Sequence, residues 1–293
     1  MIRAIYAPLL VALSFLTILP VGLSSATDVE ISRSRGWYPL VGLLYGLLLL
    51  GLVLLWALAL GAPVFTPVLA ALLVMAMAAA NRFLHLDGLM DFCDAMWGGH
   101  TVERRLEIMR DSRVGSFAVA GCVSVLLVKY SALLSLLTMV PGLGGLLFFP
   151  VVARWAMTLL LTVFPYGRPQ GIGSAFASSG RPWLATGFAL LTVAAVAWFL
   201  LGLAGIVTLV VVSVVSLLLG WRASRRLGGG LTGDCYGAAN EIMETLALVL
   251  LLILLWRLEL DGMGFTIGYG GGILTEFRWP FALEYGWFSY SAY

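Results

Sequence analysis

Residues 37–61 read WYPLVGLLYGLLLLGLVLLWALALG, a run of 25 residues without a charged side chain. A helix needs about 20 apolar residues to cross the hydrocarbon core of a bilayer, so this run is long enough to span a membrane. Similar runs recur along the chain, at 2–20, 64–81, 114–139, 143–164, 183–201, 203–220 and 245–258. The sequence therefore predicts an all-α, polytopic membrane bundle of about seven to eight transmembrane helices.

The overall composition agrees with this class. The chain is 61% hydrophobic and only 11% charged, with a mean hydropathy of +1.01, whereas soluble domains average about 25% charged residues. The net charge of +2 is too small to indicate nucleic-acid binding. Three cysteines, Cys93, Cys122 and Cys235, form no CxxC pair, which argues against structural zinc and a disulfide framework.

The connections between the predicted spans are of two kinds. Tight, uncharged turns are expected at Gly61-Ala-Pro63, Pro141-Gly142 and Gly202, and longer polar loops at 21–36, 82–113, 165–182 and 221–244. Alternation of eight spans puts all four polar loops on one face. Twelve of the seventeen Arg and Lys residues lie in these loops, so the positive-inside rule predicts that this face is cytoplasmic. We expect one transmembrane domain over 1–258 with its polar loops in the cytoplasm, followed by a Gly- and aromatic-rich tail over 259–293.

The richest polar segment is 81–115, NRFLHLDGLMDFCDAMWGGHTVERRLEIMRDSRVG, which holds six of the fifteen acidic residues. Asp87, Asp91 and Asp94 are spaced i, i+4 and i+7, so on a helix they fall within roughly 60° of one another around the axis. Three carboxylates on one stripe repel each other unless a cation lies between them, and a divalent metal that also holds phosphate oxygens is the natural candidate. The alternative is a solvated acidic loop, but apolar residues interleave with these acids.

Four arginines follow the acidic stripe within ten residues: Arg104, Arg105, Arg110 and Arg113. Ion pairs with Glu103 and Glu107 along a short amphipathic helix are the simpler explanation. Guanidinium forks also suit phosphate oxygens, and a metal–carboxylate face beside an arginine face is what pyrophosphate chemistry needs. We therefore predict that these arginines bind substrate phosphate.

A second acidic segment, GGGLTGDCYGAANEIME, occupies 228–244 and places Asp234, Glu241 and Glu244 after a Gly run. Its start resembles a phosphate-binding loop but lacks the GK[ST] ending of a Walker motif. Together with the first stripe, it suggests a second set of metal or substrate ligands. Lys129 and Arg154 fall inside predicted spans, where charges are rare, and could either neutralise substrate phosphate or pair with acids.

Four stretches, in this order and spacing, resemble the cobalamin synthase family, also called adenosylcobinamide-GDP ribazoletransferase or cobalamin-5′-phosphate synthase. They are FLTILP at 15–20, HLDGLMDFCD at 85–94, RRLEIMRDSRVG at 104–115 and LTGDCYGAANE at 231–241. The resemblance implies a Mg²⁺-dependent membrane enzyme that joins adenosylcobinamide-GDP to α-ribazole or its 5′-phosphate and releases GMP. It does not extend to the tail after Gly262.

The reaction that the resemblance implies suggests a role for each of the predicted site residues. Mg²⁺ would be held by Asp87, Asp91, Asp94, Asp234 and Glu241. Arg104, Arg105, Arg110 and Arg113 would hold phosphate oxygens, and Asp94 or Glu241 would accept the proton of the attacking hydroxyl. The expected partners are the two substrates and the lipid bilayer, with no nucleic acid; a homo-oligomer is compatible with the sequence.

Two other functions compete with this prediction. A phospholipid-type CDP-alcohol phosphotransferase also uses an acidic membrane helix, but Leu89-Met-Asp-Phe92 stands where its DGxxAR pattern requires Ala-Arg. A divalent-cation transporter would use the acids as its ion path. The acids, however, cluster in polar loops beside arginines, and none lies in a predicted span.

Overall fold

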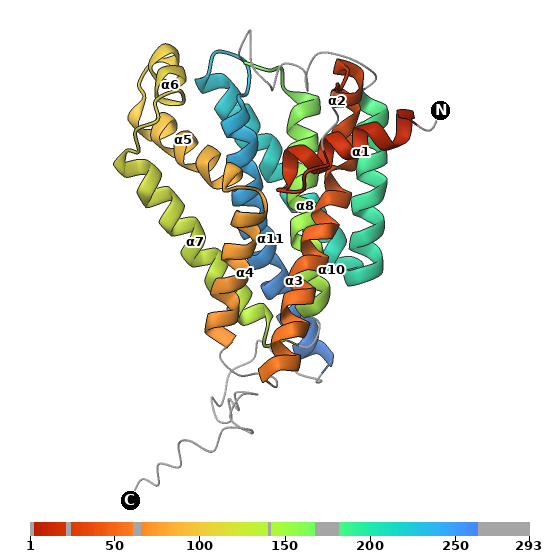
Figure 1. The fold of residues 1–293 in the computed structure, drawn as a ribbon. Coiled ribbons are helices and arrows are strands. Elements are labelled where there is room, and N and C mark those ends of the chain that lie inside the picture. Colours follow the sequence, from red (N-terminus) through yellow and green to blue (C-terminus); the bar gives the residue numbers. More distant parts are fainter. Residues whose placement is uncertain (1–2, 22–24, 61–65, 140–141, 168–181, 263–293) are drawn as a thin grey trace, which may run out of the picture. The chain divides into compact units, whose positions relative to one another are not determined.

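The structure is a computed structural model that describes residues 3–21, 25–60, 66–139, 142–167 and 182–262. The chain divides into two units, Met1–Arg257 and Leu258–Tyr293, and the architecture below is that of the first. Every regular element in the described ranges is a helix, and the strand-like pairing there is one isolated bridge. The predicted all-α membrane class is therefore confirmed (Figure 1).

The described helices are, in chain order, α1 (Arg3–Leu16), α2 (Asp28–Ser34), the 3₁₀ turn η1 (Arg35–Trp37), α3 (Tyr38–Leu60), α4 (Thr66–Ala80), α5 (Leu84–Gly98), α6 (Val102–Ile108), α7 (Ser116–Leu136), α8 (Gly142–Val163), α10 (Pro182–Arg226) and α11 (Gly233–Gly262). Within the described ranges, five helical segments are long and apolar enough to cross a membrane, or six if α4 and α5 together form one bent span. The predicted count of seven to eight therefore stays a prediction.

Helix α10 reverses direction at Gly202, whose φ of 55° and ψ of −130° are not helical. Near the start of α10, Thr186 lies 2.6 Å from Thr162 at the end of α8, measured between hydroxyl oxygens. Gly220, near the other end of α10, packs against Leu160 in the same part of α8. Both ends of α10 therefore meet one end of α8, and the predicted turn at Gly202 is confirmed. The other two predicted turns include residues outside the described ranges.

Helix α8 is the central element of the bundle. In its most apolar stretch 78% of the residues are buried, against 22% for α7, which lies at the periphery (Figure 1). Helix α3 packs closely on α8 because Gly42 and Gly46 place bare backbone against the carbonyls of Pro150 and Leu147. Small residues four apart commonly allow such approach between membrane helices. This packing brings Tyr45 of α3 against α8.

The described parts of the four predicted polar loops meet at one end of the bundle, called the polar end below. The backbone N–H of Gly167 donates to the carbonyl of Leu231 at 2.8 Å. Arg105 donates from Nη1 to the carbonyl of Arg226 at 3.2 Å, and Arg35 donates to a carbonyl in the last turns of α8 at 2.9 Å. The described parts of these segments therefore share one end of the bundle, while the side of the membrane that they face stays a prediction.

Two of those polar segments, which the sequence placed between spans, are largely helical, in agreement with the helical spacing of their acids. The 82–113 segment contains α5 and α6, and α5 is bent from α4 by 89°. In 221–244 only the short stretch between α10 and α11 is non-helical, so Glu241 and Glu244 lie inside a helix apolar enough to cross a membrane. The prediction that no acid lies within a span is wrong. Charged residues at 221–226 and 234–244 interrupt the apolar pattern, so the predicted spans end at 220 and begin at 245, but α10 and α11 continue through these residues.

Candidate functional site

Helix α5 carries the acidic stripe across the polar end of the bundle. It starts after Arg82 and Phe83, two non-glycine residues with φ near 60°, a left-handed conformation that costs roughly 1–2 kcal/mol per residue. This turn redirects the chain from α4 into α5 (Figure 1). Asp87, Asp91 and Asp94 all lie in α5, Asp87 exposed and the other two half-buried. The spacing predicted from sequence is therefore realised on one helix.

The two acidic segments come together where α5 crosses α11. A Cβ on Gly88 would lie 3.1 Å from the backbone of Asp234, and one on Gly237 would lie 3.2 Å from the backbone of His85. The two helices approach this closely because Gly88 on α5 and Gly237 on α11 have no side chains at the contact. The crossing therefore sets Asp234, in the first turn of α11, beside the helix that carries Asp87 and Asp91. The sequence pattern predicted the acids, but Gly237 gave no signal in it beyond its small size.

Asp94 has a structural partner that the sequence did not reveal. Its Oδ2 accepts a hydrogen bond from the backbone N–H of Gly115 at 2.6 Å, and its Oδ1 accepts one from Ala118 at 2.8 Å. These N–H groups belong to the N-terminus of α7, where amides have no helical partner and the helix dipole favours a negative charge. Asp94 thus joins α5 to α7 in the way that an N-cap residue does.

The four predicted phosphate-binding arginines differ in their surroundings. Arg104 pairs with Glu107 at 2.7 Å on the exposed surface of α6, and Arg113 pairs with Asp111 at 2.6 Å. Hydrogen bonds from Arg113 hold the pKa of Asp111 down at about 2. Arg105 reaches the backbone of α10, as described above. Arg110 is exposed, and its side chain has no hydrogen-bond or ion-pair partner among the described residues.

Glu241 and Glu244 lie in a buried ion network below the α5–α11 crossing. Lys129 of α7, the only lysine in the chain, donates to Glu241 and, at 2.7 Å, to Glu244. Arg154 of α8 donates to the other oxygen of Glu244. All four side chains are at most 4% exposed. The sequence left open whether Lys129 and Arg154 neutralise substrate phosphate or pair with acids, and in the structure they pair with acids.

The predicted metal ligands do not form one ready cluster. Among the described residues, no three His, Cys, Asp or Glu side chains are grouped as a metal site. The crossing nevertheless gathers carboxylates from two helices, and carboxylate oxygens are the ligands that Mg²⁺ prefers. Mg²⁺ is usually bound by one or two carboxylates together with substrate phosphates and water. The donor chemistry of Asp87, Asp91 and Asp234 therefore fits Mg²⁺ held jointly with a diphosphate, and the assignment stays a prediction.

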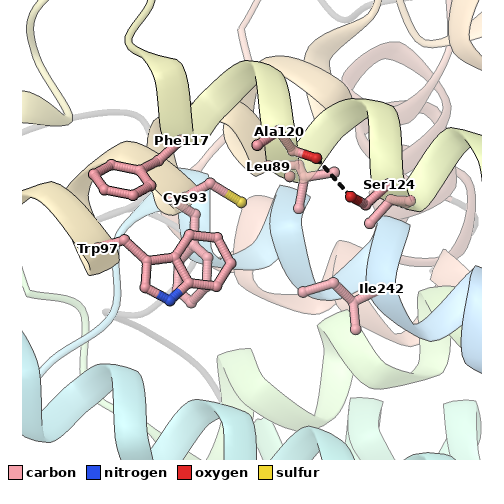
Figure 2. A pocket seen from close by; sticks show the side chains of 10 residues that line it. Leu89, Cys93, Trp97, Phe117, Ala120, Ser124 and Ile242 are labelled. Atoms are coloured by element: carbon pink, nitrogen blue, oxygen red, sulfur yellow. Dashed lines mark hydrogen bonds between the residues drawn. The ribbon is translucent and has the colours of Figure 1, made fainter.

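An apolar cleft of about 520 Å³ lies between α5, α7 and α11 (Figure 2). Its α5 wall includes Leu89, Cys93 and Trp97. Leu89 and Cys93 each follow an acid of the stripe by two residues, so they point roughly 160° away from Asp87 and Asp91. The cleft therefore opens on the face of α5 opposite the stripe, no charged residue lines it, and it is not the place for diphosphate chemistry.

Comparison with known proteins agrees with the motif resemblance. A family model described as cobalamin-5-phosphate synthase matches residues 8–252. The chain is 45% identical over 253 residues to the adenosylcobinamide-GDP ribazoletransferase of Pseudomonas putida, covering 84% of this chain and 98% of that protein. The protein of that name from Desulfitobacterium hafniense is 39% identical over 249 residues, covering 82% and 94%. No solved structure matches the chain.

Proposed function

Because the chain belongs to the cobalamin-5-phosphate synthase family, we propose that it catalyses the reaction for which its relatives are named. It transfers the adenosylcobinamide phosphate moiety of adenosylcobinamide-GDP to α-ribazole or its 5′-phosphate and releases GMP. The observation that carries this proposal is the α5–α11 crossing, where the two acidic motifs of the family resemblance come together.

The reaction exchanges the phosphoanhydride bond of the diphosphate for a new phosphoester bond. A hydroxyl oxygen of the acceptor attacks the phosphorus on the cobinamide side of the diphosphate, and the bond from that phosphorus to the GMP oxygen breaks. The hydroxyl proton passes to a base, and GMP leaves with the negative charge. The demands on the protein are therefore to hold a highly charged diphosphate, to orient the hydroxyl and to accept one proton.

Mg²⁺ is the cofactor that we propose for this site, held by Asp87, Asp91 and Asp234 together with the diphosphate. When bound, it supplies positive charge that neutralises the diphosphate and the departing phosphate. The glycine contact at Gly88 supports this assignment because it keeps the carboxylates of α5 and α11 near one another.

Arg110 is the arginine that we assign first to a substrate phosphate, because its exposed side chain has no competing partner among the described residues. Arg104 and Arg113 can join it, since their ion pairs are exposed and such pairs contribute only about 0–1 kcal/mol. Arg105 has a different role in this proposal: it fixes α6 to the end of α10.

The proton acceptor is assigned to Asp87. The candidates from sequence were Asp94 and Glu241, but both are engaged in other interactions. Asp94 accepts hydrogen bonds from two backbone N–H groups of α7, and Glu241 accepts a hydrogen bond from Lys129. Asp87 is exposed on the stripe and within reach of an incoming hydroxyl.

The cytoplasmic membrane is the proposed location, with the polar end on the cytoplasmic side. The concentration of Arg and Lys in the segments at that end supports this orientation. It also places the carboxylates in the compartment where guanine nucleotides are found.

Product formation by the purified protein tests the proposed function. The protein in detergent is incubated with adenosylcobinamide-GDP, α-ribazole and Mg²⁺, and GMP and the cobalamin product are quantified. We expect the two products in equal amounts, and none when EDTA removes the metal. A folded protein that forms neither in a lipid environment would contradict the proposal, and metal flux into liposomes without nucleotide would favour a transporter instead.

A further inference from the structure

The buried ion network joins three helices at one level of the bundle. Lys129 belongs to α7, Arg154 to α8, and Glu241 and Glu244 to α11. The two positive and two negative charges balance, so the network is neutral as a whole. Removing one member of such a network leaves an uncompensated buried charge, which is strongly unfavourable.

Further contacts fix the network in place. The guanidinium of Arg154 lies over the ring of Tyr45 of α3, 4.2 Å from the ring centre. The amide of Asn240 donates to Glu244 at 3.0 Å. Among the buried polar atoms without a protein partner are Nε and Nη2 of Arg154, Oδ1 of Asn240 and Nε2 of His85. A buried polar network that already has unpaired atoms is destabilised strongly when one more of its hydrogen-bond partners is removed.

The network lies close to the candidate site along α11. Glu241 follows Asp234 by seven residues, which is about 10 Å along a helix. Gly237 lies between them and contacts the backbone of α5 at His85. The rotation and depth of α11 therefore decide two things together: whether Glu241 meets Lys129, and whether Gly237 faces α5.

We propose that Glu241 and Glu244, held by Lys129 and Arg154, are positioning residues that lock α11 so that Asp234 stays beside the acidic stripe of α5. Glu241 then acts through α11 and does not itself bind metal or accept the proton. This inference rests on the proposed function for its catalytic meaning, but the positions of the helices can be measured without any substrate.

The test compares Lys129→Met, Glu241→Gln and the double variant Lys129→Met/Glu241→Gln. Each single change unbalances the buried charges, whereas the double variant leaves the neutral pair of Arg154 and Glu244. We expect turnover to fall by about tenfold or more in each single variant and to return to within a few-fold of the parent in the double variant. A metal-binding or proton-accepting Glu241 would leave the double variant as inactive as Glu241→Gln, and that result would overturn the proposal.

A second readout follows α11 directly. Cys235 is buried in the first turn of α11, and Cys93 is buried where α5 packs on α7 at Gly121. The rate at which N-ethylmaleimide modifies each thiol is measured by mass spectrometry under conditions where all variants remain folded. We expect faster labelling of Cys235 in the single variants, parent-like labelling in the double variant, and little change at Cys93.

The two readouts separate the possible failures. Equally faster labelling of Cys93 and Cys235 in the single variants would mean that the network only stabilises the whole bundle. An unchanged labelling rate at Cys235 in folded Lys129→Met would mean that the network does not hold α11. Either result overturns the proposal. If the parent protein fails to turn over adenosylcobinamide-GDP, the proposed function falls, while the labelling rates still decide the positioning role. Thr208→Val is the matched control, because it removes a buried polar group from α10, a helix that contributes no member to the network.

Discussion

The three aspartates of α5 are equivalent in the sequence pattern but not in the structure. Asp94 is turned to the N-terminus of α7 and accepts two of its backbone N–H groups. Asp87 is exposed on the stripe, one residue before the glycine that contacts α11. The same residue type therefore serves stability at one end of the stripe and, in our proposal, chemistry at the other.

This difference predicts opposite effects of two substitutions. Asp87→Asn removes charge at nearly constant size, so we expect turnover to be lost while the thermal unfolding midpoint stays close to that of the parent. Asp94→Ala removes the acceptor at the start of α7, which should destabilise the protein by about 0.5–2 kcal/mol, the usual range for a lost helix cap. GMP release and thermal unfolding in detergent measure both quantities.

Asp91→Asn serves as the companion to Asp87→Asn, because Asp91 lies one turn further along the same stripe. An active Asp91→Asn enzyme would remove the hypothesis that the stripe binds metal. An Asp94→Ala protein as stable as the parent would show that the bonds to Gly115 and Ala118 are not those of a stabilising cap.

At the scale of the helices, the sequence predicted the apolar elements well and the charged ones poorly. Most long apolar spans agree with the structure within a few residues, because a run without charges has few alternatives to a membrane helix. The extents of α5 and of the start of α11 were not predicted, because acids interrupt their hydropathy and both segments were assigned to polar connections between spans. Glu241, for example, is offset by Lys129, a partner 112 residues distant in sequence, and distant partners leave no mark on local periodicity.

The glycine contact between α5 and α11 predicts a steric effect on activity. A methyl group at Gly88 would lie 3.1 Å from the backbone of Asp234, which cannot rotate away as a side chain can, so Gly88→Ala must separate the helices by a few tenths of an ångström. We expect turnover to fall by roughly tenfold, since sub-ångström misplacement of catalytic groups is costly.

Gly187→Ala is the matched control for this experiment. Gly187 is also inside a helix, but a Cβ there would meet nothing within 4 Å. We expect this variant to keep parent activity and to be more stable by about 0.5–1 kcal/mol, the usual gain for alanine over glycine in a helix. Equal losses in the two variants would contradict the steric explanation.

At the scale of the whole bundle, one end holds almost all the residues of the candidate site. The α5–α11 crossing, the arginines of α6 and the hydrogen bonds between loop segments all lie at the polar end, and the pattern of apolar spans was enough to predict that these segments meet. Which carboxylates meet there was not predictable, because it depends on a glycine contact between residues about 150 positions apart. The sequence therefore predicted that the polar segments meet, and the packing determined which of their carboxylates lie close together.

The side of the membrane that the polar end faces can be tested with one helix. Ser112 precedes α7 and Thr138 follows it, both exposed, and the 21 residues of α7 span about 32 Å between them. With the polar end in the cytoplasm, a membrane-impermeant maleimide should label Thr138→Cys in intact cells and Ser112→Cys only after permeabilisation, with the parent protein as background. Labelling of Ser112→Cys alone in intact cells would put the carboxylates outside, away from cytoplasmic nucleotides. The positive-inside argument and the proposed source of the substrate would then fail together, while the fold itself would stand.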